Sequence, residues 1–259
     1  MFPFLNLGPI GLPTAPLVYI LGVWLALYAV DRAARRLERD PERYYGLAAA
    51  TLLAGFVGAR LTFVLLRWSS FDDNLLGIIW PLTSGYNAVG GAIIGAAAAV
   101  FYGRWRNLPL WPALDVLAPG LVIFLMTASL ADFLGGPGFG ALTDAPWGIT
   151  QFGVRRHPVQ LYELLVGLIA LGTWWWATTT RWATTTRYRN APGRAALLTV
   201  AVYAGGRLFV EAYRANALLT DGGIRVVQVI SLAVVLLCLI IVARMRLTPA
   251  GMEAIQAGE

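Results

Sequence analysis

The chain has 259 residues, of which 58% are hydrophobic and 13% charged, with a mean hydropathy of +0.65. A soluble protein of this length needs a more polar surface, so the composition predicts one polytopic membrane domain over residues 1–259. The net charge is +6, but the basic residues fall mainly in short loops and form no stripe with aromatic side chains, which argues against a nucleic-acid partner. The single cysteine, Cys238, excludes disulfides and thiolate metal sites within the chain.

Seven segments are apolar and long enough to cross a bilayer core of about 30 Å. The predicted fold is therefore an all-α membrane protein with seven transmembrane helices. The third segment is short and rich in glycine and alanine, which predicts close packing against neighbouring helices. A run at 75–82 is too short to span and predicts a re-entrant or interfacial piece. The predicted spans are 16–34, 44–66, 86–103, 110–134, 157–177, 194–214 and 225–244.

The arginines predict the orientation of these helices. Thirteen of them lie in alternate loops or at the C-terminal end, all on one side of the membrane. Because positive residues accumulate on the cytoplasmic side, the N-terminus is predicted outside and the C-terminus inside. These arginines are Arg32, Arg35, Arg36, Arg39, Arg43, Arg104, Arg106, Arg181, Arg187, Arg189, Arg194, Arg244 and Arg246.

Five ionisable residues lie inside the predicted spans, toward the outer side: Arg60, Glu163, Arg207, Glu211 and Arg214. A charge at the centre of a spanning helix costs about 2.5–3.5 kcal/mol on insertion scales, so such residues usually face one another or a wet cavity. The last three follow helical spacing and share one face. With a rise of about 1.5 Å per residue, all five lie in the outer half of the membrane, where we expect them to converge. Either a functional site or a structural ion network fits this pattern.

Three other polar residues lie near the ends of predicted spans. His157, the only histidine, precedes Pro158 at the start of a span, where it fits either a general base or a helix cap. Asp115 is placed near the cytoplasmic end of its helix, which favours packing or capping. Asp132 falls at the outer end of the same helix, where a carboxylate could act as a base.

Two stretches, RRHPVQLYE at 155–163 and YAGGRLFVEAYR at 203–214, resemble the prolipoprotein diacylglyceryl transferase family. The first carries that family's His-Pro-x-Gln-Leu-Tyr-Glu string, and the second its Tyr, Arg, Val-Glu and Arg pattern. Weaker similarities lie at 58–65, 114–119, 143–148 and 226–232, in the family's order. The resemblance implies the same seven-helix topology with the N-terminus outside. The matched residues are His157, Pro158, Gln160, Leu161, Tyr162, Glu163, Tyr203, Arg207, Val210, Glu211 and Arg214.

The chain departs from the family pattern at other positions. Counted from Asp115, the family's signature arginine falls on Ser129, its asparagine on Asp132 and its glutamate on Pro137. The family's catalytic histidine aligns with Val89 or Gly90, and a first-helix tyrosine aligns near Ala15.

The resemblance implies an enzyme of the bacterial cytoplasmic membrane that moves a diacylglyceryl group from phosphatidylglycerol to a lipobox cysteine. That reaction needs a base for the thiol and cations for the phosphodiester, and no cofactor or metal. The implied catalytic residues are Arg207, Glu163, His157 and Glu211. The implied substrate-binding residues are Arg60, Tyr203, Arg214, Gln160 and Tyr162.

The implied partners are phosphatidylglycerol or another anionic phospholipid and the signal peptides of prolipoproteins. An inactive homologue that binds a lipid or a partner protein is the alternative, because several family positions are substituted. A small-solute transporter is a third hypothesis, disfavoured because no repeat of transporter scale is visible.

Overall fold

The computed structural model describes residues 4–7, 10–71, 76–79, 85–179 and 191–245. Within these ranges, seven helices are long and apolar enough to cross a membrane, as predicted. They are α1 (Thr14–Arg36), α2 (Pro41–Leu66), α4 (Ala88–Trp105), α5 (Leu110–Gly135), α6 (Val159–Thr179), α9 (Arg194–Val210) and α10 (Val226–Met245). The shorter elements are η1 (Trp68–Ser70), α3 (Leu76–Ile79) and η2 (Glu211–Tyr213), with the hairpins β1 (Phe4–Leu7)–β2 (Ile10–Pro13) and β3 (Ile149–Gln151)–β4 (Val154–Arg156).

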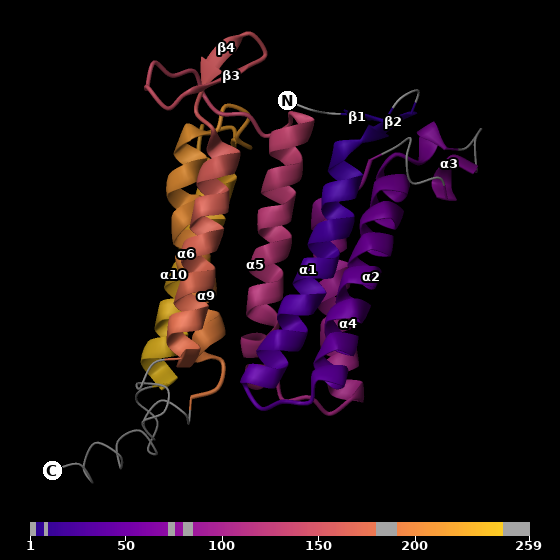
Figure 1. Cartoon of the computed structure of the whole chain (residues 1–259), viewed down its shortest axis with the longest axis vertical. Helices are drawn as coiled ribbons and strands as arrows, with labels where there is room; N and C mark the ends of the chain where they lie inside the picture. The colour runs from indigo at the N-terminus through magenta and orange to yellow at the C-terminus, as the bar shows by residue number, and fades with distance from the viewer. Residues whose placement is uncertain (1–3, 8–9, 72–75, 80–84, 180–190, 246–259) are drawn as a thin grey trace, which may run out of the picture.

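Helix α5 lies in the middle of the bundle (Figure 1), where it packs on α1, α6 and α9. On one side of it, α1 and α4 pack on α2; on the other, α9 packs on α6 and α10. Helix α1 begins and α10 ends at opposite ends of the bundle, as an odd number of crossings requires. We call the end that carries the β3–β4 hairpin the outer end, following the orientation that the arginines predict.

Helices α2 and α4 approach closely because glycine faces glycine between them. A Cβ atom added to Gly91 would lie 2.8 Å from the carbonyl oxygen of Gly55, and one added to Gly95 would lie 3.1 Å from that of Thr51. Such backbone approach is the way small residues pack helices in a membrane. The glycine-rich third span therefore packs against a neighbour, as predicted.

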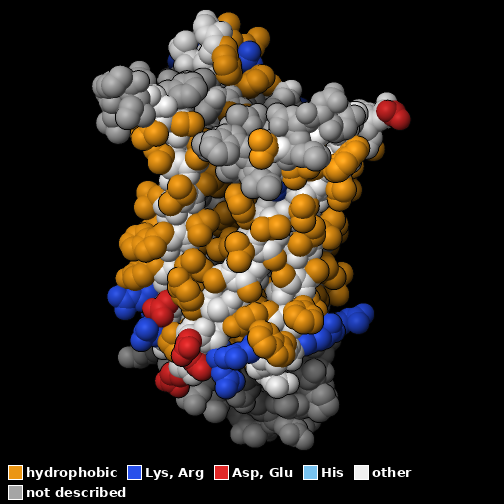
Figure 2. All heavy atoms as spheres, turned by 90° about the vertical axis from the view of Figure 1, so that its right-hand side faces the viewer, with side chains coloured by type: hydrophobic (Ala, Val, Ile, Leu, Met, Phe, Trp, Pro, Cys, Tyr) orange, Lys and Arg blue, Asp and Glu red, His pale blue; other side chains and the backbone are white. Residues whose placement is uncertain are grey.

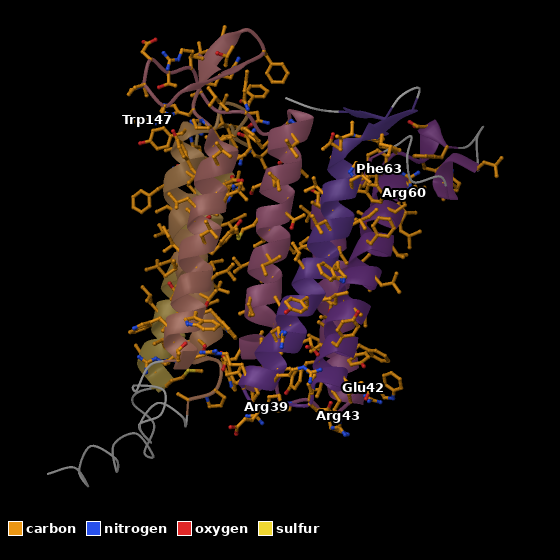
Figure 3. All side chains as sticks on the ribbon, in the orientation of Figure 1. Arg39, Glu42, Arg43, Arg60, Phe63 and Trp147 are labelled. Carbon is orange, nitrogen blue, oxygen red and sulfur yellow. The ribbon has the colours of Figure 1, made fainter. Side chains whose placement is uncertain are left out.

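The surface of the bundle is that of a membrane protein. Figure 2 shows hydrophobic side chains over the middle of one face, with arginines and acidic residues gathered at the end opposite the outer end. Arg39, Glu42 and Arg43 lie at that end in Figure 3. Large apolar side chains such as Leu65 and Phe101 are more than two-thirds exposed along the helices, where lipid would cover them.

The outer end holds the main differences from the prediction. The sixth span was expected to run to residue 214, but α9 ends at Val210 and tightens into η2. The physical reason is a competing backbone partner: Ala141 N donates to Tyr213 O, and Ala215 N donates to Phe139 O. The expected interfacial piece at 75–82 contains the short helix α3, and its residues 75 and 80–82 lie outside the described ranges.

Neither hairpin was predicted. In the β3–β4 turn, Phe152 and Gly153 both have positive φ angles, 53° and 78°. A two-residue turn of this kind normally uses Asn-Gly or Asp-Gly, so a phenylalanine there gives no hairpin signal.

Asp115 joins three helices at the opposite end, which confirms the predicted capping role. Its two carboxylate oxygens accept hydrogen bonds from the backbone N–H groups of Gly193, at 2.5 Å, and Ala196, at 2.8 Å. Its backbone oxygen accepts from Trp174 Nε1 at 2.8 Å. Asp115 in α5 therefore satisfies the first N–H groups of α9 while its backbone holds α6.

Replacing Asp115 with alanine is expected to lower the free energy of unfolding by about 2 kcal/mol, because two buried N–H groups lose their acceptor. The thermal midpoint in detergent measures the loss. Asp144→Ala, in an exposed outer loop, is the matched control and should leave the midpoint unchanged. Equal midpoints for the two variants would contradict the capping role.

Candidate active site

Glu163 is the centre of an ion network at the outer end. This residue of α6 is 3% exposed, and its Oε1 accepts from the guanidinium groups of both Arg207 and Arg214. Its Oε2 accepts from the hydroxyl of Ser129 in α5, at 2.6 Å. The residues that meet here come from α5, α6, α9 and the segment after η2.

Glu211 supplies the second carboxylate of this network. Its Oε2 lies 3.5 Å from Arg207 Nη2 and 3.2 Å from Arg214 Nε, and the residue is 1% exposed. Two carboxylates thus face two guanidinium groups. Because breaking a buried pair leaves an uncompensated charge, the four groups depend on one another.

The two arginines differ in the exposed fraction of their side chains. Arg214 also donates from Nη1 to the carbonyl oxygen of Gly138 at 3.0 Å, and its side chain is 12% exposed. The side chain of Arg207 is 21% exposed. Arg225 donates to the backbone oxygens of Glu211, at 2.6 Å, and Arg214, at 3.0 Å. It therefore holds the segment 211–214 in place. Arg207 is therefore the better placed of the two to meet a ligand.

The start of α6 forms an aromatic cluster. The hydroxyl of Tyr162 accepts from Trp147 Nε1 at 2.9 Å and lies 3.2 Å from His157 Nδ1. The His157 ring also packs on Tyr213, with 4.7 Å between ring centroids. The carbonyl of Pro158 accepts from Leu161 N and Tyr162 N. The proline thus marks the helix start, as predicted, and the histidine ring contacts tyrosine, which the sequence did not predict.

Gln160 and Tyr203 lie close in sequence to the network residues. Gln160 is fully buried, and its Nε2 donates to the carbonyl oxygen of Pro137 at 3.1 Å. Its Oε1 has no hydrogen-bond partner among the described residues. Tyr203 is half-buried in α9, one turn before Arg207. Gln160 therefore ties α6 to the turn after α5.

Arg60 was expected to join the other four charges, and the structure corrects this. Its guanidinium donates to three carbonyl oxygens, those of Gly77, Ile78 at 3.0 Å and Gly85 at 3.0 Å. Phe63 and Tyr86 lie beside it, 5.9 and 5.7 Å from ring centroid to Cζ. Figure 3 places Arg60 on α2, on the other side of α5 from α6 and α9. The loop after α2 supplies closer partners than the network does.

We expect Arg60→Gln to loosen this loop, because an amide cannot donate to three carbonyls at once. Hydrogen exchange followed by mass spectrometry should show faster exchange of the backbone N–H groups in 76–79 and 85–87. Arg67→Gln is the control, because the side chain of Arg67 is exposed and contacts the ring of Phe63. Equal exchange in both variants would show that Arg60 does not hold the loop.

Sequence reasoning missed two members of the site. Arg225 precedes the last helix, and only the fold brings it to the Glu211 carbonyl. Ser129 stands at a substituted family position, but nothing in its surroundings predicted a bond to Glu163.

The positions aligned with the family's histidine do not point to the network. Val89 is 69% exposed, and a side chain on Gly90 would collide with Thr62 at 2.2 Å. Within the described ranges, no three His, Cys, Asp or Glu side chains gather as metal ligands would.

Known proteins match almost the whole chain. The pattern that defines prolipoprotein diacylglyceryl transferases matches residues 4–244. The chain belongs to the prolipoprotein diacylglyceryl transferase family. A relative in Thermosynechococcus vestitus, named phosphatidylglycerol–prolipoprotein diacylglyceryl transferase, is 30% identical over 90% of this chain and 87% of its own. A relative of the same name in Chloroflexus aggregans is 28% identical, over 85% of this chain and 81% of its own.

Membership in the diacylglyceryl transferase family confirms the resemblance drawn from the two motifs. Both motifs lie at the network: the α6 motif carries Glu163, and the α9 motif carries Arg207 and Glu211. At the position assigned to the family's signature arginine, Ser129 donates to Glu163. This transferase-family chain is therefore a multi-pass membrane protein whose matched motifs form one ion network around two buried carboxylates.

Proposed function

We propose that this protein is a phosphatidylglycerol–prolipoprotein diacylglyceryl transferase of the bacterial cytoplasmic membrane. The observation that carries the proposal is the pair of guanidinium groups, Arg207 and Arg214, held by Glu163 and Glu211 at the outer end. Family membership supplies the reaction, and this network supplies the cations that its phosphodiester requires.

The reaction replaces a C–O bond with a C–S bond. The thiolate of a lipobox cysteine attacks the terminal glyceryl carbon of the lipid, and glycerol phosphate leaves with the bonding electrons. Negative charge develops on the phosphate oxygen as that bond breaks. Arg207, the more exposed guanidinium, would contact this oxygen, while Glu163 and Glu211 orient its side chain.

The remaining predicted residues would serve the lipid and the peptide. Tyr203 and Gln160 flank the network along α9 and α6, and Arg214 is the second cation of the site. His157 and Tyr162 form the rim of the site with Tyr213, which is 47% exposed. Amphipathic rings at this level suit the boundary where a signal peptide leaves the bilayer.

The test uses the purified full chain in phosphatidylglycerol vesicles with a synthetic lipobox peptide. The peptide should gain the mass of a diacylglyceryl group, and glycerol phosphate should appear in equal amount. A peptide with serine in place of the cysteine is the control. Absence of both products, together with failure to support growth of a transferase-depleted bacterium, would overturn the proposal.

One observation favours the alternative of an inactive lipid-binding homologue. The family's signature arginine is replaced by Ser129, and its histidine position is held by Val89 or Gly90. An inactive homologue would retain bound anionic phospholipid after purification and lose it in Arg207→Ala, without forming lipidated peptide. The transfer assay therefore separates the two functions.

A further inference from the structure

Asp132 is a carboxylate beside the ion network, and it forms no ion pair with any described residue. It lies in the last turn of α5 and is half-buried. Among the described residues, its side chain forms no hydrogen bond or salt bridge, whereas Glu163 and Glu211 are buried and each paired with two guanidinium groups. Both glutamates therefore orient arginines, and among the described residues beside the network Asp132 is the carboxylate left to accept a proton.

Asp132 lies close to Arg214 of the ion network. A Cβ atom added to Gly138 would lie 2.6 Å from Arg214 Nη1 and 3.3 Å from Asp132 Oδ2, so these two atoms flank one position. Arg207 and Arg214 both interact electrostatically with the Asp132 carboxylate, and so does Tyr19 of α1. Within the described ranges, the ionisable groups around it are thus Tyr19, Arg207 and Arg214, with Glu163 beyond the arginines on α6.

The other positions considered for a base contact groups outside the ion network. The Nδ1 atom of His157 lies 3.2 Å from the Tyr162 hydroxyl, and its ring packs against Tyr213. On α4, Val89 faces outward and Gly90 packs against Thr62, so neither position brings a titratable group to the network. The reaction requires a base within reach of the cations, and Asp132 meets that requirement.

We propose that Asp132 is the general base that removes the proton from the acceptor cysteine. This inference rests on the proposed transferase function. The carboxylate accepts the thiol proton as sulfur bonds to the glyceryl carbon, and the carbon–oxygen bond to the phosphate breaks. The proton then passes from Asp132 to the departing glycerol phosphate, so the carboxylate is regenerated for the next turnover. The neighbouring guanidinium groups favour the thiolate, which lowers the demand on a weak base.

The test measures kcat, KM for phosphatidylglycerol and the pH profile of Asp132→Asn in the vesicle assay. Asparagine keeps the shape and removes the base, so kcat should fall by about 100-fold or more while KM changes little. The wild-type rate should fall toward acid as the carboxylate becomes protonated, and Asp132→Asn should lose this acid limb. Asp132→Glu should recover most of the rate. Asp144→Asn, in the exposed outer loop, should behave as the wild type.

Three results would overturn the inference. Asp132→Asn could keep its rate and acid limb; it could change KM with kcat intact, which would make Asp132 a headgroup contact; or Asp132→Glu could fail to restore activity while its thermal midpoint stays normal. In each case an active wild-type enzyme leaves the proposed function standing. An inactive wild-type enzyme would instead defeat the proposed function and, with it, the role of Asp132.

Discussion

Replacing Arg207 with alanine is expected to lower kcat/KM for diacylglyceryl transfer by about 10³-fold, because a fixed cation at a breaking phosphate ester stabilises the transition state strongly. Arg207 is the network cation with the more exposed side chain, at 21% against 12% for Arg214. Its partners Glu163 and Glu211 hold the guanidinium in place before the substrate arrives. Initial rates at several phosphatidylglycerol concentrations in mixed vesicles give kcat/KM directly.

Two companion variants sharpen this result. Arg207→Lys keeps the charge but loses the planar fork that spans two carboxylates, so a substantial part of the loss should remain. Arg106→Ala, exposed at the opposite end of the bundle, removes an arginine with no role at the site and should keep wild-type kcat/KM. A wild-type kcat/KM in Arg207→Ala would exclude Arg207 as the cation that meets the phosphate.

Replacing Glu163 with alanine is expected to lower the free energy of unfolding by about 3–5 kcal/mol. This carboxylate is 3% exposed and accepts from two guanidinium groups and from Ser129. Without it, two partly buried cations would share the single carboxylate of Glu211, and the hydroxyl of Ser129 would keep only its 3.3 Å hydrogen bond to the carbonyl oxygen of Leu125. Unfolding by denaturant in mixed micelles, followed by tryptophan fluorescence, measures the change.

The matched control for Glu163 is an ion pair on the surface. Asp31 lies 2.9 Å from Arg35 at the opposite end, where the side chain of that arginine is 61% exposed. Asp31→Ala should cost less than about 1 kcal/mol, because water solvates both partners of an exposed pair. A similarly small cost for Glu163→Ala would mean that water reaches the network and that its charges are not mutually dependent.

The sequence predicted the helices and most of the network well. Apolar length alone located all seven spans, because the bilayer leaves few alternatives to a helix. The spacing of Arg207, Glu211 and Arg214 indicated one face, and the three are indeed neighbours in the network. Glu163 was predicted to lie near these three residues because it falls at the same depth in the membrane. The sidedness of the membrane stays a prediction from the arginines.

What the sequence did not predict depends on contacts between distant segments. Arg60 lies at the same depth as the network, but depth along a helix does not say which way the side chain faces. Its guanidinium instead donates to nearby backbone carbonyl oxygens. Ser129 is an ordinary residue for a helix interior, so nothing marked it as a donor to Glu163. Arg225 lies just before α10, where an arginine does not indicate a buried contact, and only the fold brings it to the backbone of Glu211.

The sharing of one Glu163 oxygen by two arginines has a consequence for biogenesis. Glu211 travels with Arg207 and Arg214 on the same stretch of chain, so those charges are partly neutralised as they enter the bilayer. Glu163 enters earlier, on α6, and both of its guanidinium partners arrive only with the following span. We therefore expect α6 to be stable in the lipid only once α9 has packed against it, so that the two helices insert cooperatively.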